Sequence, residues 1–181
     1  EFANKEQIPF FDLRSQEGVL RGMMLRTSTT GEVMLLVQAK VVDDAQMAWL
    51  AKDLQAVDKS TPLVICMHAP LFTINNDGEQ VYGFADGKSE ALVELVKGFD
   101  SVKFFSGHSH RTVSYVHPEY PNIVEYNVTS IGGDLWTTPG KSGVNIGEDG
   151  ADAGLYLCTF SGGEFSKRWY STEGGSAYPF R

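Results

Sequence analysis

The chain has 181 residues, of which 42% are hydrophobic and 21% are charged, and its net charge is −8 at pH 7. This length and composition suffice for an ordinary domain with an apolar core, and they exclude a disordered chain. No apolar run approaches the ~20 residues that a membrane-spanning helix needs, and the acidic charge disfavours a nucleic-acid partner because it repels phosphate.

The N-terminal segment, residues 1–38, is predicted to hold a short helix, a loop and two strands. Apolar stretches at residues 20–25 and 33–37 flank a polar, turn-like run at residues 27–32. This pattern is typical of a β-hairpin.

A helix is predicted to begin after Asp43. This residue is a candidate N-cap, and Gln46 stands three residues later at the capping-box position. Apolar residues then recur at steps of three and four, which places them on one helical face. They are Met47, Leu50, Leu54 and Val57.

The middle of the chain alternates between helix and strand patterns. Residues 63–67 are a continuous apolar run between breakers, which favours a strand buried on both faces. Residues 73–88 are rich in Asn, Asp and Gly and predict a long loop, after which Ser89 is a candidate cap for a helix that continues towards Phe99. Residues 102–105 predict a second strand. The resulting order indicates an α/β layer.

After residue 111 the pattern becomes strand-rich. Four strands are predicted, at residues 112–116, 123–128, 155–160 and 165–170. The last two flank a Ser-Gly-Gly-Glu sequence and should form a hairpin. Residues 132–152, rich in Gly and Asp, are predicted to form a long surface excursion.

The two cysteines, Cys66 and Cys158, form neither a zinc-binding pattern nor a disulfide framework. Both are interpreted as buried small hydrophobic residues. The sequence is compatible with a disulfide between them and with two free thiols, so it does not indicate the redox compartment.

Three of the four histidines follow the two central strands. His68 comes directly after the first strand, and His108 and His110 follow the second through a Ser-Gly pair. Ligands of open α/β sheets bind beyond the carboxyl ends of the strands, so adjacent parallel strands would bring these imidazoles to one place. Neutral imidazole is a good ligand for divalent Zn, Fe, Mn or Co. The sequence therefore predicts a metal site at His68, His108 and His110.

Each histidine also has a plainer interpretation. A single His after a strand is commonly a polar loop residue or a hydrogen-bonded core residue, and His-x-His alone is a common pattern. From spacing alone both interpretations stay open. His117, which precedes Pro118 in a polar stretch, is interpreted as a surface histidine.

The sequence around these histidines resembles the calcineurin-like metallophosphoesterases. That family has a Gln-x-x-Trp-Leu helix, then a strand ending in His-x-Pro, then a strand ending in Gly-His-x-His. The same order occurs here at residues 46–50, 68–70 and 107–110. The resemblance covers residues 42–131, and residues 132–181 are similar to a C-terminal module of some bacterial members, which are often exported. It implies a partial metallophosphoesterase sandwich, with a helix-strand-helix-strand layer followed by antiparallel β-strands.

The resemblance also implies hydrolysis of phosphoric esters at a two-metal site, with Mn, Fe or Zn as the metal. Paired divalent ions lower the pKa of bound water and stabilise both the attacking and the leaving oxygen. By analogy, His68 and His108 would bind one metal ion and His110 the other. Pro70 and Ser109 would at most shape the site.

Three further motifs of the family do not occur before Gln46: Asp-x-His, Gly-Asp-x-x-Asp and Gly-Asn-His-Asp/Glu. They would supply the bridging Asp and a phosphate-contacting His. Because two close 2+ charges need a bridging carboxylate, we expect at most one weakly held metal ion, little activity from this chain alone, and no assignable catalytic residue. The loop acids Asp77, Asp86 and Asp134 could reach the site, but solvated surface positions are the simpler interpretation.

Residues 1–38 carry a second resemblance, to ribosomal RNA uracil-5 methyltransferases, in the runs at residues 9–21 and 26–34. The cofactor-binding glycine loop, the catalytic Cys and its base are not found, so no methyltransferase activity is expected. The three predicted regions are therefore residues 1–38, 39–131 and 132–181. Two family signatures in a chain without an initiating Met suggest a fused or rearranged fragment.

The sequence supports three functional hypotheses. The first is a fragment of a metal-dependent phosphoric ester hydrolase, weakly active or inactive alone. The second is a non-enzymatic binding or structural module with vestigial histidines, and the third is an RNA methyltransferase remnant. An incomplete fold would leave sheet surface uncovered, so self-association is also predicted. The substrate and the compartment are not indicated.

Overall fold

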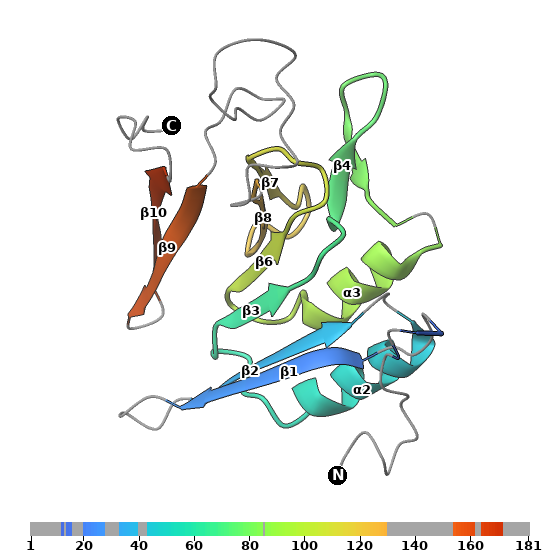
Figure 1. Cartoon of the computed structure of the whole chain (residues 1–181), viewed down its shortest axis with the longest axis vertical. Coiled ribbons are helices and arrows are strands. Elements are labelled where there is room, and N and C mark those ends of the chain that lie inside the picture. Colours follow the sequence, from blue (N-terminus) through green and yellow to red (C-terminus); the bar gives the residue numbers. More distant parts are fainter. Residues whose placement is uncertain are drawn as a thin grey trace. The chain divides into compact units, whose positions relative to one another are not determined.

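The structure is a computed structural model, and it describes residues 12, 14–15, 20–27, 33–39, 43–84, 86–129, 154–161 and 164–171 (Figure 1). The chain divides into two compact units, Glu1–Val57 and Asp58–Arg181. The predicted boundaries after residues 38 and 131 stay predictions.

The first unit contains the predicted hairpin and helix. Strands β1 (Leu20–Thr27) and β2 (Val33–Ala39) pair antiparallel, from Leu20 opposite Ala39 to Thr27 opposite Val33. The short helix predicted before the hairpin lies almost wholly outside the described residues. The hairpin itself is confirmed.

Helix α2 (Asp44–Leu54) begins where the sequence predicts it. The Asp43 carboxylate accepts a hydrogen bond from the Gln46 N–H (2.8 Å), and the Gln46 side chain accepts one from the Asp43 N–H (3.2 Å). This capping box satisfies two of the N–H groups that a helix start leaves without partners. Leu54, the last helical residue, is buried, whereas Val57 lies beyond the helix.

The second unit is built on a four-stranded sheet in the order β3-β6-β8-β7. Its strands are β3 (Leu63–Cys66), β6 (Val102–Ser106), β7 (Val113–Val116) and β8 (Ile123–Asn127). The pairs β3–β6 and β6–β8 are parallel, and β7–β8 is antiparallel. The chain is therefore mixed α/β, and the parallel pairing of the two central predicted strands is confirmed.

The core of this unit lies where β6, β8 and helix α3 (Lys88–Val96) bury side chains. Its fully or almost fully buried apolar residues include Leu92, Val93, Val96, Phe99, Val102, Phe104 and Ile123. Every second residue of β6 and β8 is buried, as expected for strands with one face on a core. The Asn122 amide donates to the carbonyls of Lys97 (3.1 Å) and Phe99 (2.6 Å), which joins the end of the helix to the start of β8.

Strand β3 is not buried on both faces, so this prediction is wrong. It is an edge strand of the described sheet, and Val64 is 44% exposed. Cys66 is also exposed, which corrects its interpretation as a buried residue; Cys158 is half-buried, and both thiols are free. The apolar run predicts a strand, but it does not specify whether both faces of that strand are covered.

The predicted long loop at residues 73–88 contains a small hairpin instead. Strands β4 (Phe72–Ile74) and β5 (Gln80–Tyr82) pair antiparallel. The Asn75 side chain accepts hydrogen bonds from the N–H groups of Asp77 (3.0 Å) and Glu79 (2.9 Å), and Gly78 adopts a φ of 82°. The Asn, Asp and Gly content therefore marks a tight turn between short strands.

Helix α3 is capped differently from the prediction. Its N-cap is Gly87 in a left-handed conformation, and no side chain caps it. Ser89 is the second residue of the helix, is fully buried, and accepts a hydrogen bond from the Phe84 N–H (3.1 Å). Its hydroxyl therefore holds the preceding loop to the helix.

The predicted C-terminal hairpin is confirmed as β9 (Gly154–Ser161) and β10 (Glu164–Ser171), with Ser161 opposite Glu164. Phe165 packs against Phe105 and Tyr126, with ring centroids 6.0 and 5.3 Å apart. The excursion predicted at residues 132–152 lies outside the described residues. Within the described part of the chain, neither helix has the length and apolar character required to cross a membrane.

Candidate functional site

Two parallel strands bring His68 and His108 together. Cys66 at the end of β3 pairs with Phe105 in β6. The pairing continues past the strand ends, because the Met67 N–H donates to the Phe105 carbonyl (2.9 Å) and the Gly107 N–H to the His68 carbonyl (3.0 Å). His68 and His108 therefore follow paired strand ends at the same edge of the sheet.

The two imidazoles are in direct contact. His68 Nε2 lies 3.2 Å from His108 Nδ1, and the rings meet edge to face with centroids 5.1 Å apart and an angle of 76°. Both side chains are exposed. One ring can donate its N–H to the other, or both nitrogens can direct their lone pairs towards a cation.

The third predicted ligand is not joined to this pair in a cluster. His110 is half-buried. Among the residues that the structure describes, no group of three or more His, Cys, Asp or Glu side chains is arranged to hold a metal ion. The structure thus brings together two of the three predicted histidines, and the metal role of all three stays a prediction.

The loop that carries His108 and His110 has an unusual backbone. His108 has a φ of 66° and His110 a φ of 54°, and they are the non-glycine residues with positive φ in the described chain. The left-handed conformation costs an L-residue about 1–2 kcal/mol. Such outliers cluster at functional sites, where the surrounding structure holds them in place.

A buried carboxylate joins the two histidine-bearing loops. Glu125 on β8 is fully buried, and its Oε1 accepts hydrogen bonds from the Leu71 N–H (2.7 Å) and the Ser106 hydroxyl (2.6 Å). Its Oε2 accepts from the Phe72 N–H (2.8 Å). Burial raises the pKa of the Glu125 carboxyl, and the three hydrogen bonds oppose this shift.

Asn127, two residues further along β8, holds the residues on either side of His108. Its amide donates to the Ser106 hydroxyl (3.0 Å) and the Gly107 carbonyl (2.8 Å), and its carbonyl accepts from the Ser109 hydroxyl (2.6 Å). Asn127 is almost fully buried. Sequence analysis missed both Asn127 and Glu125. The available signal was two polar residues at every second position of a strand whose alternate residues face the core.

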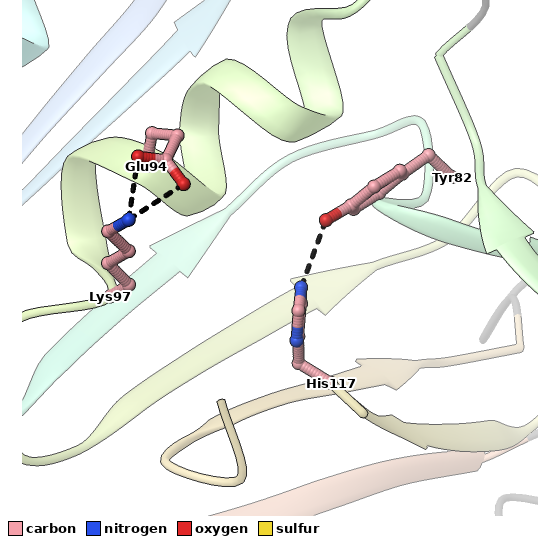
Figure 2. A network of polar contacts seen from close by, with 4 residues as sticks. All are labelled: Tyr82, Glu94, Lys97 and His117. Carbon is pink, nitrogen blue, oxygen red and sulfur yellow. Dashed lines mark hydrogen bonds and ion pairs between the residues drawn. The ribbon is translucent and has the colours of Figure 1, made fainter. Parts of the chain in front are cut away.

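His117 is not a surface residue, so that interpretation is wrong. It is only 4% exposed, and its Nδ1 accepts hydrogen bonds from the N–H groups of Glu119 and Tyr120, both 3.1 Å away. Its Nε2 lies 2.9 Å from the Tyr82 hydroxyl, as Figure 2 shows. Because Nδ1 accepts, the proton is on Nε2 and the ring is neutral. Burial lowers the pKa of His117.

The remaining candidates lie away from the histidine pair. Asp77 and Asp86 are exposed, in the β4–β5 turn and before α3 respectively, whereas Asp134 lies outside the described residues. Figure 2 also shows an ion pair between Glu94 and Lys97 (2.8 Å). It lies at the surface, where such pairs contribute little.

Similar proteins match parts of the chain. A phosphoenolpyruvate phosphatase from Allium cepa is 32% identical over 120 residues, which are 61% of this chain and 22% of that protein. An uncharacterized RNA methyltransferase from Bacteroides thetaiotaomicron is 37% identical over 76 residues, 42% of this chain and 16% of that protein. Another from Porphyromonas gingivalis is 59% identical over 32 residues, 18% of this chain and 7% of that protein.

No protein-family model matches the chain. The chain spans less than a quarter of the length of each relative that it matches. The similarities support both resemblances in coarse form, one to phosphatases and one to RNA methyltransferases.

Proposed function

We propose that the chain is part of a metal-dependent phosphoric ester hydrolase, to which it contributes His68 and His108 as ligands of one divalent ion. The observation that carries this proposal is the 3.2 Å separation of their nitrogens at the carboxyl edge of two parallel strands. Two nitrogens at ~2.0–2.1 Å from one tetrahedral ion are ~3.3–3.4 Å apart, so the pair fits a single ion. The similarity to a phosphatase supports the reaction class.

In this proposal the chain's own residues would bind the metal ion and orient the phosphate ester. Neutral imidazoles donate lone pairs to borderline ions such as Zn, Mn or Fe, and the exposure of both rings leaves room for a phosphate ester to approach. A bound ion would supply a Lewis acid for the phosphoryl oxygen and would lower the pKa of bound water. His110 remains the candidate ligand for a second ion. With two imidazoles gathered among the described residues, we expect weak binding and slow turnover.

Calorimetric titration of the full chain with Zn²⁺ and Mn²⁺ tests the proposal. His68→Ala and His108→Ala should each weaken binding by at least the ~10–100-fold that loss of an outer-shell partner costs. Asp77→Asn and Asp86→Asn are matched controls, because both remove an exposed carboxylate outside the pair, and they should leave the affinity unchanged. Equal affinity in wild type and both histidine variants would reject the proposal in favour of a non-enzymatic module.

The rate at which the chain hydrolyses a generic aryl phosphate with added Mn²⁺ distinguishes an incomplete site from a complete one. We expect slow hydrolysis that His108→Ala abolishes. Robust turnover by the wild-type chain, lost in the same variant, would show that the chain assembles a complete site and would overturn the fragment interpretation.

A second candidate is RNA modification, which the two methyltransferase matches favour. A functional remnant would bind S-adenosylmethionine. Titration of the chain with this cofactor decides the question, because heat of binding would support the candidate and its absence would remove it.

Self-association also remains a prediction. Among the described strands β3 pairs with β6 alone, and Val64 on it is 44% exposed. An unpaired strand edge and an exposed apolar face would both favour association. Multi-angle light scattering should detect dimers or larger species, and a clean monomer would contradict the prediction.

A further inference from the structure

Two side chains of β8 connect the histidine-bearing loops to one rigid element. Glu125 accepts from the backbone three and four residues after His68 and from Ser106, two residues before His108. Asn127 bonds Ser106, Gly107 and Ser109. One strand therefore sets the positions of both loops through six hydrogen bonds.

The polar composition of this buried network indicates that its role is to position the groups that it joins. A buried carboxylate has a large desolvation cost, and apolar residues of the same size usually stabilise a core at least as well. A fully satisfied polar network instead specifies one arrangement of the groups that it joins. Here those groups are the backbone three and four residues after His68 and the two residues that flank His108.

The backbone conformation of His108 gives a second reason to assign a positioning role to this network. Its φ of 66° is disfavoured for a non-glycine residue, and Asn127 bonds the Gly107 carbonyl before it and the Ser109 hydroxyl after it. Holding both neighbours fixes the direction in which His108 leaves the strand. The ring is then presented to His68 at hydrogen-bond distance.

We infer that Glu125 and Asn127 are positioning residues that hold the His68–His108 pair ready to bind a cation. The role as a cation site rests on the proposed function. The geometric part of the inference, that β8 fixes the distance between the two imidazoles, does not.

The chain offers a matched control for this inference. Asn122 directly precedes β8, at the opposite end from the histidines. Its amide donates two hydrogen bonds, as that of Asn127 does, and both of its acceptors are backbone carbonyls. Asn122→Ala removes comparable hydrogen bonds at the other end of the same strand. It should lower stability without moving the histidines.

The first measurement needs no metal. Correlation spectra of ¹⁵N-labelled histidine rings report on the tautomer and hydrogen bonding of each imidazole. Asn127→Ala and Glu125→Gln should shift the ring signals of His68 and His108, whereas the signals of buried His117 serve as an internal measure of the fold. Asn122→Ala should leave all of them in place.

Ser109→Ala keeps the test decisive if Asn127→Ala fails to fold. Ser109 is exposed, so this change removes one hydrogen bond to Asn127 without a cavity in the core. The His108 ring signals should shift, and those of His117 should not. Unchanged His68 and His108 signals in every variant that folds would overturn the inference.

The second measurement is Zn²⁺ affinity. Asn127→Ala and Glu125→Gln should weaken Zn²⁺ binding ~10–100-fold, as expected for residues that position a metal ligand without contacting the ion. Asn122→Ala should not weaken it. If His68→Ala leaves Zn²⁺ affinity unchanged, the proposed function fails while the ring spectra still decide the positioning role. If the spectra respond and affinity does not, positioning of the imidazoles stands and its link to the cation is refuted.

Discussion

Replacing His108 with glycine should give a more stable chain than replacing it with alanine. Both changes remove the imidazole and its contact with His68, so the difference between them isolates the backbone at a φ of 66°. Relief of the left-handed conformation is worth about 1–2 kcal/mol. The greater freedom of glycine in the unfolded chain offsets about 0.4–1 kcal/mol. The glycine variant should therefore be more stable by about 0.5–1 kcal/mol, or roughly 1–4 °C in Tm.

Denaturant unfolding of the two variants measures this difference, and Glu94 provides the control pair. Glu94 is an exposed residue of α3, where glycine should be about 1 kcal/mol less stable than alanine. The sign of the glycine-minus-alanine difference should thus reverse between the two positions. Equal stabilities at residue 108, or the same sign as at residue 94, would show that the His108 backbone is not strained.

Two further predictions concern the surroundings of the pair. Burial lowers the pKa of His117 below its ordinary value of 6.5, so the unfolded chain binds the proton first and the free energy of unfolding should fall as pH drops through 6.5. Unfolding of wild type and His117→Gln at pH 7.5 and 5.5 checks this, and parallel losses in both would contradict it. Gly83→Ala should lower the free energy of unfolding several-fold more than Gly98→Ala. A Cβ at residue 83 would overlap the Pro70 carbonyl, whereas one at residue 98 meets nothing within 4 Å. Similar thermal unfolding of the two variants would refute this.

Local interactions explain what the sequence predicts correctly. The capping box joins Asp43 and Gln46, which are three positions apart, and in the hairpin β9–β10 Ser161 pairs with Glu164. The approach of His68 and His108 follows from a single non-local fact, the parallel pairing of β3 with β6. Because the carboxyl ends of parallel strands meet at one edge, two strand assignments were enough to predict this contact.

Two incorrect predictions are local, namely the loop at residues 73–88 and the cap of α3, and the others concern burial and partners that are distant in sequence. His117 is buried because Tyr82, from a separate hairpin, closes over it. Glu125 bonds residues 71 and 72, more than 50 positions earlier in the chain. The alternation of β8 could have indicated that Glu125 is buried, but the partners of Glu125 and His117 leave no periodic signal in the sequence.

The strained loop and the buried network together favour function over folding as the reason for this arrangement. Glycine would adopt a positive φ at residues 108 and 110 with less strain, and apolar residues at 125 and 127 would avoid the cost of burying polar groups. Local rules are broken at residues 108, 110, 125 and 127. The first two are histidines of one loop, and the other two bond residues in or beside the histidine-bearing loops. Natural chains break such rules mainly at functional sites. The proposed function takes its reaction class from the similarity to a phosphatase, and in that proposal the two imidazoles at 3.2 Å are the groups that would need this support.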